Sequence, residues 1–407
     1  MITIDSLECV RMRCFRKEDS MKSLKCRKLH TGQILAGILI FFMVLAAVCI
    51  DIATAADEIR IGYIPSLTGT RAGQGAHELK AILLALKQIN AAGGVNGKKI
   101  NLIIADNQST IPGAVAAVQK VVEQEQALAL ISFIISAQVL ATSDAIKSYG
   151  IPTMIGGTNL TLTRRGNPWL FRVRSDDSIA ALAMIKYIDE DLKLRKIGIL
   201  HDSDAFGVGG ADLVERAAKE RGMVIVGREK HASGDTDYTA QLLALKSAGA
   251  EILVAYSHEV DAAWIQRQYR QLGSPYKYLG SPGSQMRSTL DISKEAAEGL
   301  LAIADFVPGQ SETNKQYAEA YRREYNEEYD ATSSWAYDAM NILAEAIKTA
   351  GEDRAKIREA ILALKGYQGV LGAFSFTPNG DGLREVSVVQ IEQGKPKLLK
   401  SVSVEAK

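Results

Sequence analysis

The residues best suited to chemistry are one histidine and two aspartates in a short segment, His201-Asp202-Ser203-Asp204. A carboxylate beside an imidazole is a combination used for general acid–base catalysis. A polar loop that follows a strand explains the same residues without any reaction, and no G-x-S-x-G nucleophile motif accompanies them in the sequence. We therefore expect a protein that is not an enzyme, with no catalytic residues.

The histidines and cysteines indicate no metal site. The five histidines are scattered, and no two of them have the i, i+4 spacing of a helical metal site. All four cysteines lie between Cys9 and Cys49, so the rest of the chain has no thiol ligand, thiol nucleophile or disulfide. We expect neither a metal ion nor a cofactor.

The glycine-rich segments do not match nucleotide-binding motifs. Around Gly97-Lys98 the earlier glycine of a phosphate-binding loop is replaced by Ala92, and Lys99 stands where serine or threonine is required. The segment from Gly207 to Gly210 lacks the third spaced glycine of a dinucleotide fingerprint. A flexible start of a helix explains these glycines better.

The composition is that of a folded globular protein. Hydrophobic residues make up 47% of the 407 residues and charged residues 23%, with a net charge of +1. This balance gives no electrostatic reason to bind nucleic acid. The length suits two domains.

The amino-terminal segment has the pattern of a secretory signal. The uncharged run from Ile34 to Ile50 follows four basic residues, and Ala53-Thr54-Ala55 forms a cleavage site of the A-x-A type. We predict a leader over residues 1–55, a mature start at Ala56 or Asp57, and Met21 as the true start. The alternative is a membrane anchor, because the apolar run is at the short limit for spanning a bilayer.

After this leader, short apolar runs alternate with amphipathic segments, which predicts parallel sheets covered by helices on both faces. The expected strands are 59–64, 100–105, 128–134, 152–155, 196–201, 223–227, 251–256 and 277–280, with β-rich runs at 374–376 and 386–391. The expected helices are 79–90, 111–126, 137–149, 177–190, 208–221, 238–248, 259–272, 314–329, 334–349 and 353–364. The fold class is therefore α/β, with two doubly wound lobes and a central ligand cleft at the strand ends.

The order of several short motifs resembles one family, the type I periplasmic substrate-binding proteins of ABC importers, and within it the branched-chain amino-acid (Leu/Ile/Val) group. The resemblance extends from Glu58 to about Val404. The motifs are Ile61-Gly62 through Leu67-Thr68-Gly69, Ile89 to Gly97, Ala105-Asp106-Asn107, Gly150-Ile151-Pro152, Gly156 to Asn159, Phe171-Arg172, Gly234 to Tyr238 and Tyr337-Asp338-Ala339.

The resemblance implies two lobes joined by a hinge of three segments, near 174–177, 305–308 and 382–384. The amino-terminal lobe would comprise residues 57–176 and 308–383, and the carboxy-terminal lobe residues 177–307 and 384–407. Closure about such a hinge is the behaviour known for this class of protein.

The resemblance also implies the binding residues. A ligand carboxylate would meet Ser136 and Thr158, with Ala137 and Gly157 beside them, where hydroxyls and a helix start supply donors. The alternative is that Ser136 and Thr158 only cap local structure. In the other lobe the expected residues are Phe206, Tyr256 and His258, with an ordinary core position as the alternative for Tyr256.

Two departures from the family bear on the ligand. The acid expected to bind a ligand ammonium is replaced by Pro282, and Gln74 stands where an aromatic lid is expected. Glu259 or Asp261 is a possible substitute carboxylate, although at a helix start we expect both to be solvated. The sequence therefore favours two classes of ligand equally: an amino acid, and a non-amino carboxylate such as an aromatic acid.

We accordingly expect a monomeric periplasmic binding protein that delivers a small ligand, an amino acid or related carboxylate, to ABC permease subunits. The alternative is a ligand-sensing periplasmic receptor of the same fold that binds an aromatic acid or amide.

Overall fold

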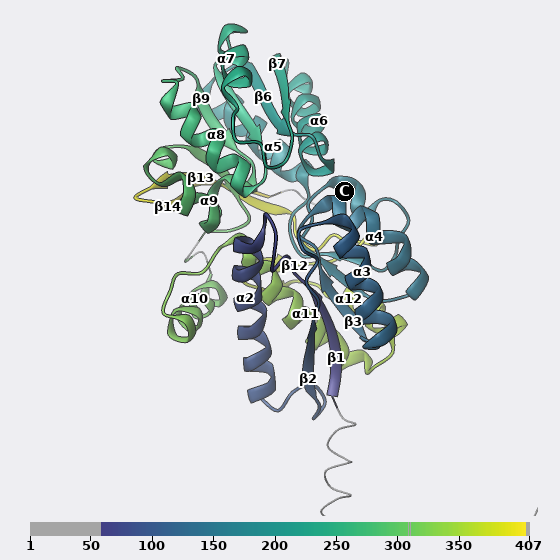
Figure 1. Cartoon of the computed structure of the whole chain (residues 1–407). Coiled ribbons are helices and arrows are strands. Elements are labelled where there is room, and N and C mark those ends of the chain that lie inside the picture. The colour runs from purple at the N-terminus through teal and green to yellow at the C-terminus, as the bar shows by residue number, and fades with distance from the viewer. Residues whose placement is uncertain (1–57, 308, 310, 404–407) are drawn as a thin grey trace, which may run out of the picture. The chain divides into compact units, whose positions relative to one another are not determined.

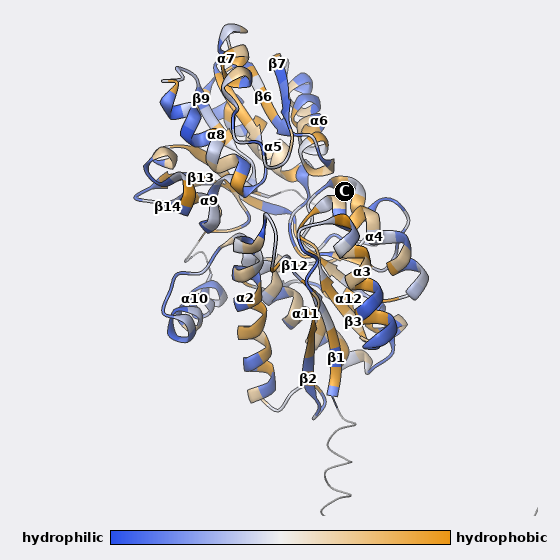
Figure 2. Ribbon diagram, in the orientation of Figure 1, coloured by the Kyte–Doolittle hydropathy of each residue, from blue (hydrophilic) through white to orange (hydrophobic). Residues whose placement is uncertain are grey.

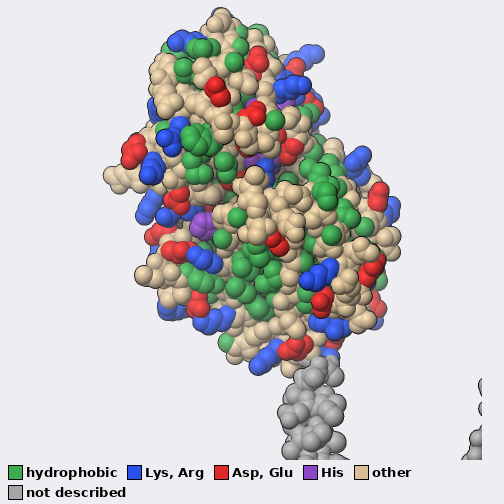
Figure 3. Space-filling view, viewed as in Figure 1, with side chains coloured by type: hydrophobic (Ala, Val, Ile, Leu, Met, Phe, Trp, Pro, Cys, Tyr) green, Lys and Arg blue, Asp and Glu red, His purple; other side chains and the backbone are tan. Residues whose placement is uncertain are grey.

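The structure is a computed structural model that describes residues 58–403 with the exception of 308 and 310. The predicted leader lies outside the described residues. Within the described range, no helix combines the length and the apolar character needed to cross a bilayer. Figure 3 shows lysine and arginine side chains interspersed with acidic ones on the visible face.

The first sheet has five strands in the order β2-β1-β3-β4-β5, and every pair in it is parallel. Its strands are short and rich in β-branched and aliphatic residues, which is typical of a sheet buried on both faces. They are β1 (Glu58–Ile64), β2 (Lys99–Ile104), β3 (Ala129–Ser132), β4 (Thr153–Ile155) and β5 (Leu170–Arg172).

Helices cover both faces of this sheet (Figures 1 and 2). Successive residues of a strand point to opposite faces, so Ile61 joins a core with α2 and α11, whereas Ile64 joins a core with α3 and α4. The helices of this lobe are α2 (Ala72–Ala91), α3 (Ile111–Gln119), α4 (Ser136–Tyr149), α10 (Glu312–Tyr325), α11 (Trp335–Ala350) and α12 (Arg354–Ala363). A small hairpin of β11 (Tyr367–Gln368) and β12 (Ala373–Phe374) follows α12.

The second sheet has seven strands in the order β14-β13-β10-β9-β8-β6-β7. It is parallel from β7 to β10, and β13 and β14 extend it as antiparallel strands. The strands are β6 (Lys196–Asp202), β7 (Val224–His231), β8 (Ile252–Tyr256), β9 (Lys277–Gly280), β10 (Leu301–Ala304), β13 (Glu385–Glu392) and β14 (Lys395–Ser403).

The helices of the second lobe also lie on two faces of their sheet. One core contains residues of α5 and α6, and the other contains residues of α7 and α8. These helices are α5 (Asp177–Tyr187), α6 (Ala205–Glu220), α7 (Thr239–Ser247), α8 (Glu259–Gln271) and α9 (Arg287–Ser293), with a 3-10 turn η4 (Pro282–Gln285) before α9. Two doubly wound lobes are therefore confirmed, while the exact lobe boundaries stay a prediction.

The chain passes between the sheets after β5, after β10 and after β12, and buried ion pairs tie these passages together. Arg172 donates from Nε to Asp381 Oδ1 at 3.0 Å, and Arg174 donates from Nε to Asp305 Oδ2 at 2.9 Å. Arg172 is wholly buried, and its Nη1 also donates to the carbonyl oxygen of Asn159.

Several predicted boundaries were wrong. The helix predicted at 208–221 begins at Ala205, because Asp204 accepts hydrogen bonds from the N–H groups of Phe206 and Gly207 and so caps it earlier. The helix predicted at 79–90 begins at Ala72, and the strand predicted at 223–227 continues to His231. The strands and α-helices missed from the sequence were β5, α9, β10, β11 and β14.

Candidate functional site

The candidate site is a small cavity between the two sheets, at the carboxyl ends of their parallel strands. Ligands bind at this position in doubly wound folds. The cavity measures about 30 Å³, which is room for about two water molecules, so the cleft is closed in this structure. Its lining residues come from both lobes: Gln74, Ile134, Ile135, Thr158, Arg174, Phe206, His258, Glu259, Pro282, Gly283, Met286 and Thr332.

On the first wall, the start of α4 faces the cavity without a side-chain cap. Ile135 occupies the cap position and makes no side-chain hydrogen bond to the helix. Ser136 does not cap α4, because its Oγ accepts a hydrogen bond from Asn159 N at 3.2 Å. The N–H groups and positive dipole end of α4 therefore remain suited to an anion.

Thr158 lines the same wall, and it does not cap the following turn, because Asn159 does so by accepting from Thr161 N. The Thr158 carbonyl is fixed by Asp177 N at 2.9 Å. Neither side chain therefore caps the element that follows it, and the roles of both in ligand binding stay a prediction. The cavity is not lined by three neighbouring residues that the sequence predicted for this wall, namely Ser136 and Ala137 at the start of α4 and Gly157 before Thr158.

On the second wall, Phe206 and His258 pack against each other with ring centroids 4.7 Å apart. His258 Nε2 lies 2.9 Å from Asp204 Oδ2. Burial alone would raise the pKa of Asp204, but His258 and the Gly207 N–H lower it below its usual range. The Asp204 carboxylate therefore holds His258 in place beneath the ligand space.

Tyr256 is a core residue and does not line the cavity, which settles the alternative that its sequence position left open. Its hydroxyl donates to Asp177 Oδ1 at 2.8 Å. Burial raises the pKa of Asp177 to about 6, although hydrogen bonds from Tyr256 and Thr158 oppose that shift.

Glu259 forms an ion pair with Arg71, which precedes α2 of the other lobe, with Arg71 Nη1 at 3.0 Å from Glu259 Oε2. Glu259 is 2% exposed and lines the cavity beside Pro282, so the prediction that it is solvated was wrong. Its second oxygen, Oε1, is buried and has no hydrogen-bond partner among the described residues. An unpaired carboxylate oxygen in such a place requires a donor.

Asp261 is also buried, again contrary to the prediction, but it does not line the cavity. Its Oδ1 accepts from Gly234 N and from the Tyr238 hydroxyl, each at 2.8 Å. Of the two candidate carboxylates, only Glu259 therefore faces the ligand space.

Gln74 lines the cavity and connects it to a second buried acid. Its Nε2 donates to Glu78 Oε1 at 3.1 Å. Burial raises the pKa of Glu78 to about 8, and the nearby carboxylates of Asp330 and Glu259 add to this shift. At neutral pH Glu78 is mainly protonated, so it supports Gln74 without adding charge.

Sequence reasoning missed several lining residues: Ile134, Ile135, Arg174, Gly283, Met286 and Thr332. It also missed Arg71, the partner of Glu259. They lie in loops and crossing segments, where periodicity carries no signal.

One group could in principle hold a metal ion, because one ligand atom each of Asp202, Asp204 and His258 lie within 4.8 Å of one another. These atoms already have partners: Asp202 accepts from Asp204 N and Ser233 Oγ, and Asp204 accepts from His258 and the start of α6. The hydrogen bonds explain the cluster as local structure.

Two α/β lobes that enclose a small cavity with paired charges define a protein that binds a small molecule. The sequence model of the periplasmic binding protein family matches residues 58–396, and the chain belongs to this family. Its members are binding proteins of the periplasm and not enzymes, so the acid–base interpretation of residues 201–204 is excluded.

Named relatives agree with this assignment. The leucine-, isoleucine-, valine-, threonine-, and alanine-binding protein of Pseudomonas aeruginosa is 28% identical over 329 residues, which cover 80% of this chain and 88% of that protein. The solved structure of the substrate-binding protein LivJ from Streptococcus pneumoniae, in complex with isoleucine, is similar with a TM-score of 0.80 at 27% identity. The similarity covers 85% of this chain and 100% of that one. The resemblance to the branched-chain amino-acid group is therefore confirmed.

Proposed function

We propose that this protein captures a free amino acid with an apolar side chain in the periplasm and delivers it to the permease of an ABC importer. The observation that carries the proposal is the buried, unpartnered Oε1 of Glu259 in the cleft. A ligand ammonium would bind at this oxygen, and Glu259 would thereby take the role of the acidic residue that the family has at the position of Pro282.

The rest of the cleft fits the same ligand. The uncapped start of α4 provides N–H donors for the carboxylate, and Thr158 lines the same wall. Ser136 lies at the start of α4 behind this wall, and its hydroxyl hydrogen would reach the carboxylate once the cleft opens around a ligand. Ile134, Phe206 and Met286 offer apolar surface to a side chain. A zwitterion also matches the local charge, because Arg71 and Glu259 already balance each other.

The names of relatives support an aliphatic amino acid, since the Pseudomonas aeruginosa protein is named for five amino acids and LivJ was solved with isoleucine. An amino acid does not fit the closed cavity of about 30 Å³, so binding requires the lobes to part and then close.

The test compares leucine with its deaminated analogue 4-methylpentanoate by calorimetry. We expect leucine to bind at least tenfold more tightly, because a hydrogen bond to a charged group contributes about 1.5–3 kcal/mol. Glu259→Gln should remove this preference. Asp261→Asn is the matched control, since it neutralises a buried acid of the same helix that does not face the cavity.

Equal or tighter binding of 4-methylpentanoate by the parent protein would overturn the amino-acid proposal and favour a non-amino carboxylate. A leucine preference that survives Glu259→Gln would show that another group binds the ammonium.

The route to the periplasm is also part of the proposal. Export by a cleaved leader, with a mature start at Ala56 or Asp57, and action as a monomer beside the permease are the arrangements that the sequence supports.

A further inference from the structure

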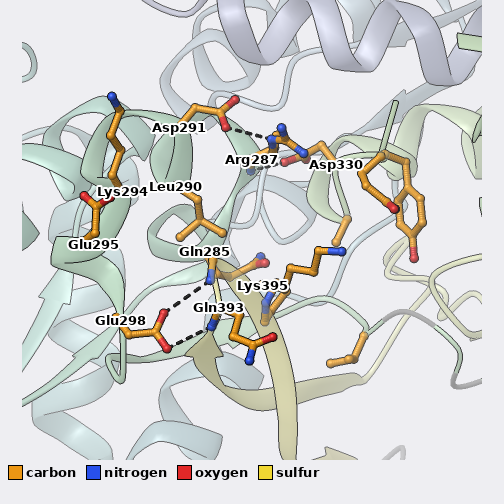
Figure 4. Close-up of a pocket in the computed structure, with 16 residues that line it drawn as sticks. Gln285, Arg287, Leu290, Asp291, Lys294, Glu295, Glu298, Asp330, Gln393 and Lys395 are labelled. Atoms are coloured by element: carbon orange, nitrogen blue, oxygen red, sulfur yellow. Dashed lines mark hydrogen bonds and ion pairs between the residues drawn. The ribbon is translucent and has the colours of Figure 1, made fainter. Parts of the chain in front are cut away.

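A second and larger cavity lies at the border of the two lobes, apart from the cleft. It measures about 630 Å³ and shares no lining residue with the cleft. One side is formed by the segment from Gln285 to Glu298 and by the turn between β13 and β14, and the other by residues 328–331, which precede α11. Its volume is that of a small-molecule site (Figure 4).

Two buried polar atoms at this second cavity have no hydrogen-bond partner in the described part of the chain. They are Gln285 Oε1 and the Tyr329 hydroxyl, on residues that are 2% and 7% exposed. The orientation of the Gln285 amide is fixed, because its Nε2 donates to Thr332 Oγ1 at 3.1 Å and to the carbonyl of Pro282 at 3.3 Å. The amide oxygen is thus an acceptor left without a donor.

In the view of Figure 4, Gln285 lies between Leu290, Gln393 and Lys395. Gln285 forms part of the cavity wall, and its Oε1 is buried in that wall, so a bound donor would reach it after a small shift of the side chain.

The charges around the cavity favour a cation. Five carboxylate side chains line it, against three cationic ones. Arg287 pairs with Asp291 and Arg322 pairs with Glu328, each at 2.9 Å. The remaining lining charges are three carboxylates, Glu295, Glu298 and Asp330, against Lys294 and Lys395. Leu290, Val307, Ala331 and the Tyr329 ring add apolar surface.

We propose that this second cavity binds an organic amine with an apolar body and no carboxylate, whose N–H groups donate to Gln285 Oε1. The excess of carboxylates attracts the ammonium and would repel a carboxylate-bearing compound. This selectivity is opposite to that of the cleft, where an anion-binding helix start faces the ligand.

The second site is coupled to closure of the cleft. The Gln285–Thr332 hydrogen bond joins the lobes, and Thr332 also lines the cleft. A second contact between lobes, from Arg287 N to Asp330 Oδ2, lies in the wall of the second cavity. The two walls of the second cavity belong to different lobes and lie side by side only when the lobes are closed, so an amine bound there favours the closed form. By linkage, the factor by which the amine tightens binding of a cleft ligand equals the factor by which that ligand tightens binding of the amine.

The test uses phenethylamine as the probe and 3-phenylpropanoate as the matched compound with opposite charge, with binding to the exported protein measured by calorimetry. We expect phenethylamine to bind and 3-phenylpropanoate to bind at least tenfold more weakly at this site. Gln285→Met should weaken phenethylamine at least tenfold, and Tyr329→Phe provides a second variant that removes only a hydroxyl. Circular dichroism checks that both variants are folded.

Glu259→Gln separates this proposal from the proposed function, because Glu259 lines the cleft and not the second cavity. Loss of its ion pair with Arg71 should weaken the amine only through the closure equilibrium, without abolishing its binding. Phenethylamine binding that persists in Glu259→Gln supports the second site even if leucine fails to bind the parent protein. No binding of phenethylamine at millimolar concentration, or binding lost in Glu259→Gln and retained in folded Gln285→Met, would overturn the proposal.

Discussion

Glu259 and Arg71 carry opposite charges into a space from which water is almost excluded. Each is nine-tenths buried or more, so each depends on the other to offset the cost of leaving water. The pair satisfies only one oxygen of Glu259. The described chain thus leaves one oxygen of this buried carboxylate without a donor, which is the basis for the proposal that a ligand ammonium binds there.

The hydroxyls of the first wall give a prediction about affinity. Ser136 Oγ accepts from Asn159 N and still has its own hydrogen to donate. Ser136→Ala should weaken amino-acid binding about tenfold to hundredfold, because it removes a donor to a carboxylate. Thr158→Ala should weaken binding as well, because Thr158 lines the cavity and its hydroxyl also bonds Asp177. Calorimetry on folded variants measures this.

Thr142→Ala is the control, since Thr142 is buried on the same helix and its hydroxyl donates to the Gln138 carbonyl. Unchanged affinity in both wall variants would mean that their hydroxyls do not contact the ligand.

Glu78 gives a prediction about pH. Its pKa is raised from 4.5 to about 8 by burial, so between these values the folded protein holds a proton that the unfolded chain has released. Stability should fall as pH rises through this window, by up to about 1.4 kcal/mol per pH unit from this group. Glu78→Gln should remove that contribution.

Chemical unfolding from pH 5 to pH 9 compares the two proteins. Asp177 and Asp338 also have raised pKa values, about 6 and about 7, so the difference between parent and variant is most specific above pH 7. Identical pH profiles would show that Glu78 does not carry the effect.

At the scale of single residues, the sequence indicated which residues lie at the cleft better than it indicated which side chains are buried. Thr158, Phe206, His258 and Gln74, which the family resemblance implied, line the cavity of the cleft, and their contacts with a ligand stay a prediction. Glu259 was misjudged, since an acid in a first helical turn is usually solvated and only the opposite lobe buries it. Arg71 could not be found for the same reason.

At the scale of elements, the passages between the sheets depend on buried charge. Arg172→Met should lower the free energy of unfolding by about 3 kcal/mol, because Asp381 loses its fully buried partner and keeps only the more exposed Arg164 as a cation. Thermal or urea unfolding measures this loss. Lys397→Met, which breaks an exposed pair with Glu392, should change stability by less than about 1 kcal/mol. Similar losses of stability in both variants would contradict a special role for the buried ion pair where the chain passes between the sheets.

The elements that the sequence missed are short or lie at an edge. β10 has 4 residues and α9 has 7, so neither is long enough to show a clear period. β14 is largely polar because it is the edge strand of its sheet. These elements are defined by their neighbours, whereas β1, β6 and β8 have apolar runs that identify them alone.

At the scale of the whole molecule, the predicted leader gives a prediction about the amino terminus of the exported protein. Amino-terminal sequencing of the periplasmic fraction should find Ala56 or Asp57, because the A-x-A site ends at Ala55. Detection of Met1 or Met21, or recovery of the protein in the membrane pellet, would favour the anchor instead.

The Arg71–Glu259 pair joins the two lobes, so its loss should change the population of closed molecules. Arg71→Met leaves Glu259 buried and unpaired in the closed form but lets water solvate it in the open form, which shifts the ligand-free protein toward opening. Small-angle X-ray scattering without ligand should then give a larger radius of gyration than the parent. Lys87→Met is the control, because it breaks a mainly exposed pair with Glu324 within one lobe. Unchanged scattering in Arg71→Met would mean that other contacts between the lobes hold the cleft closed.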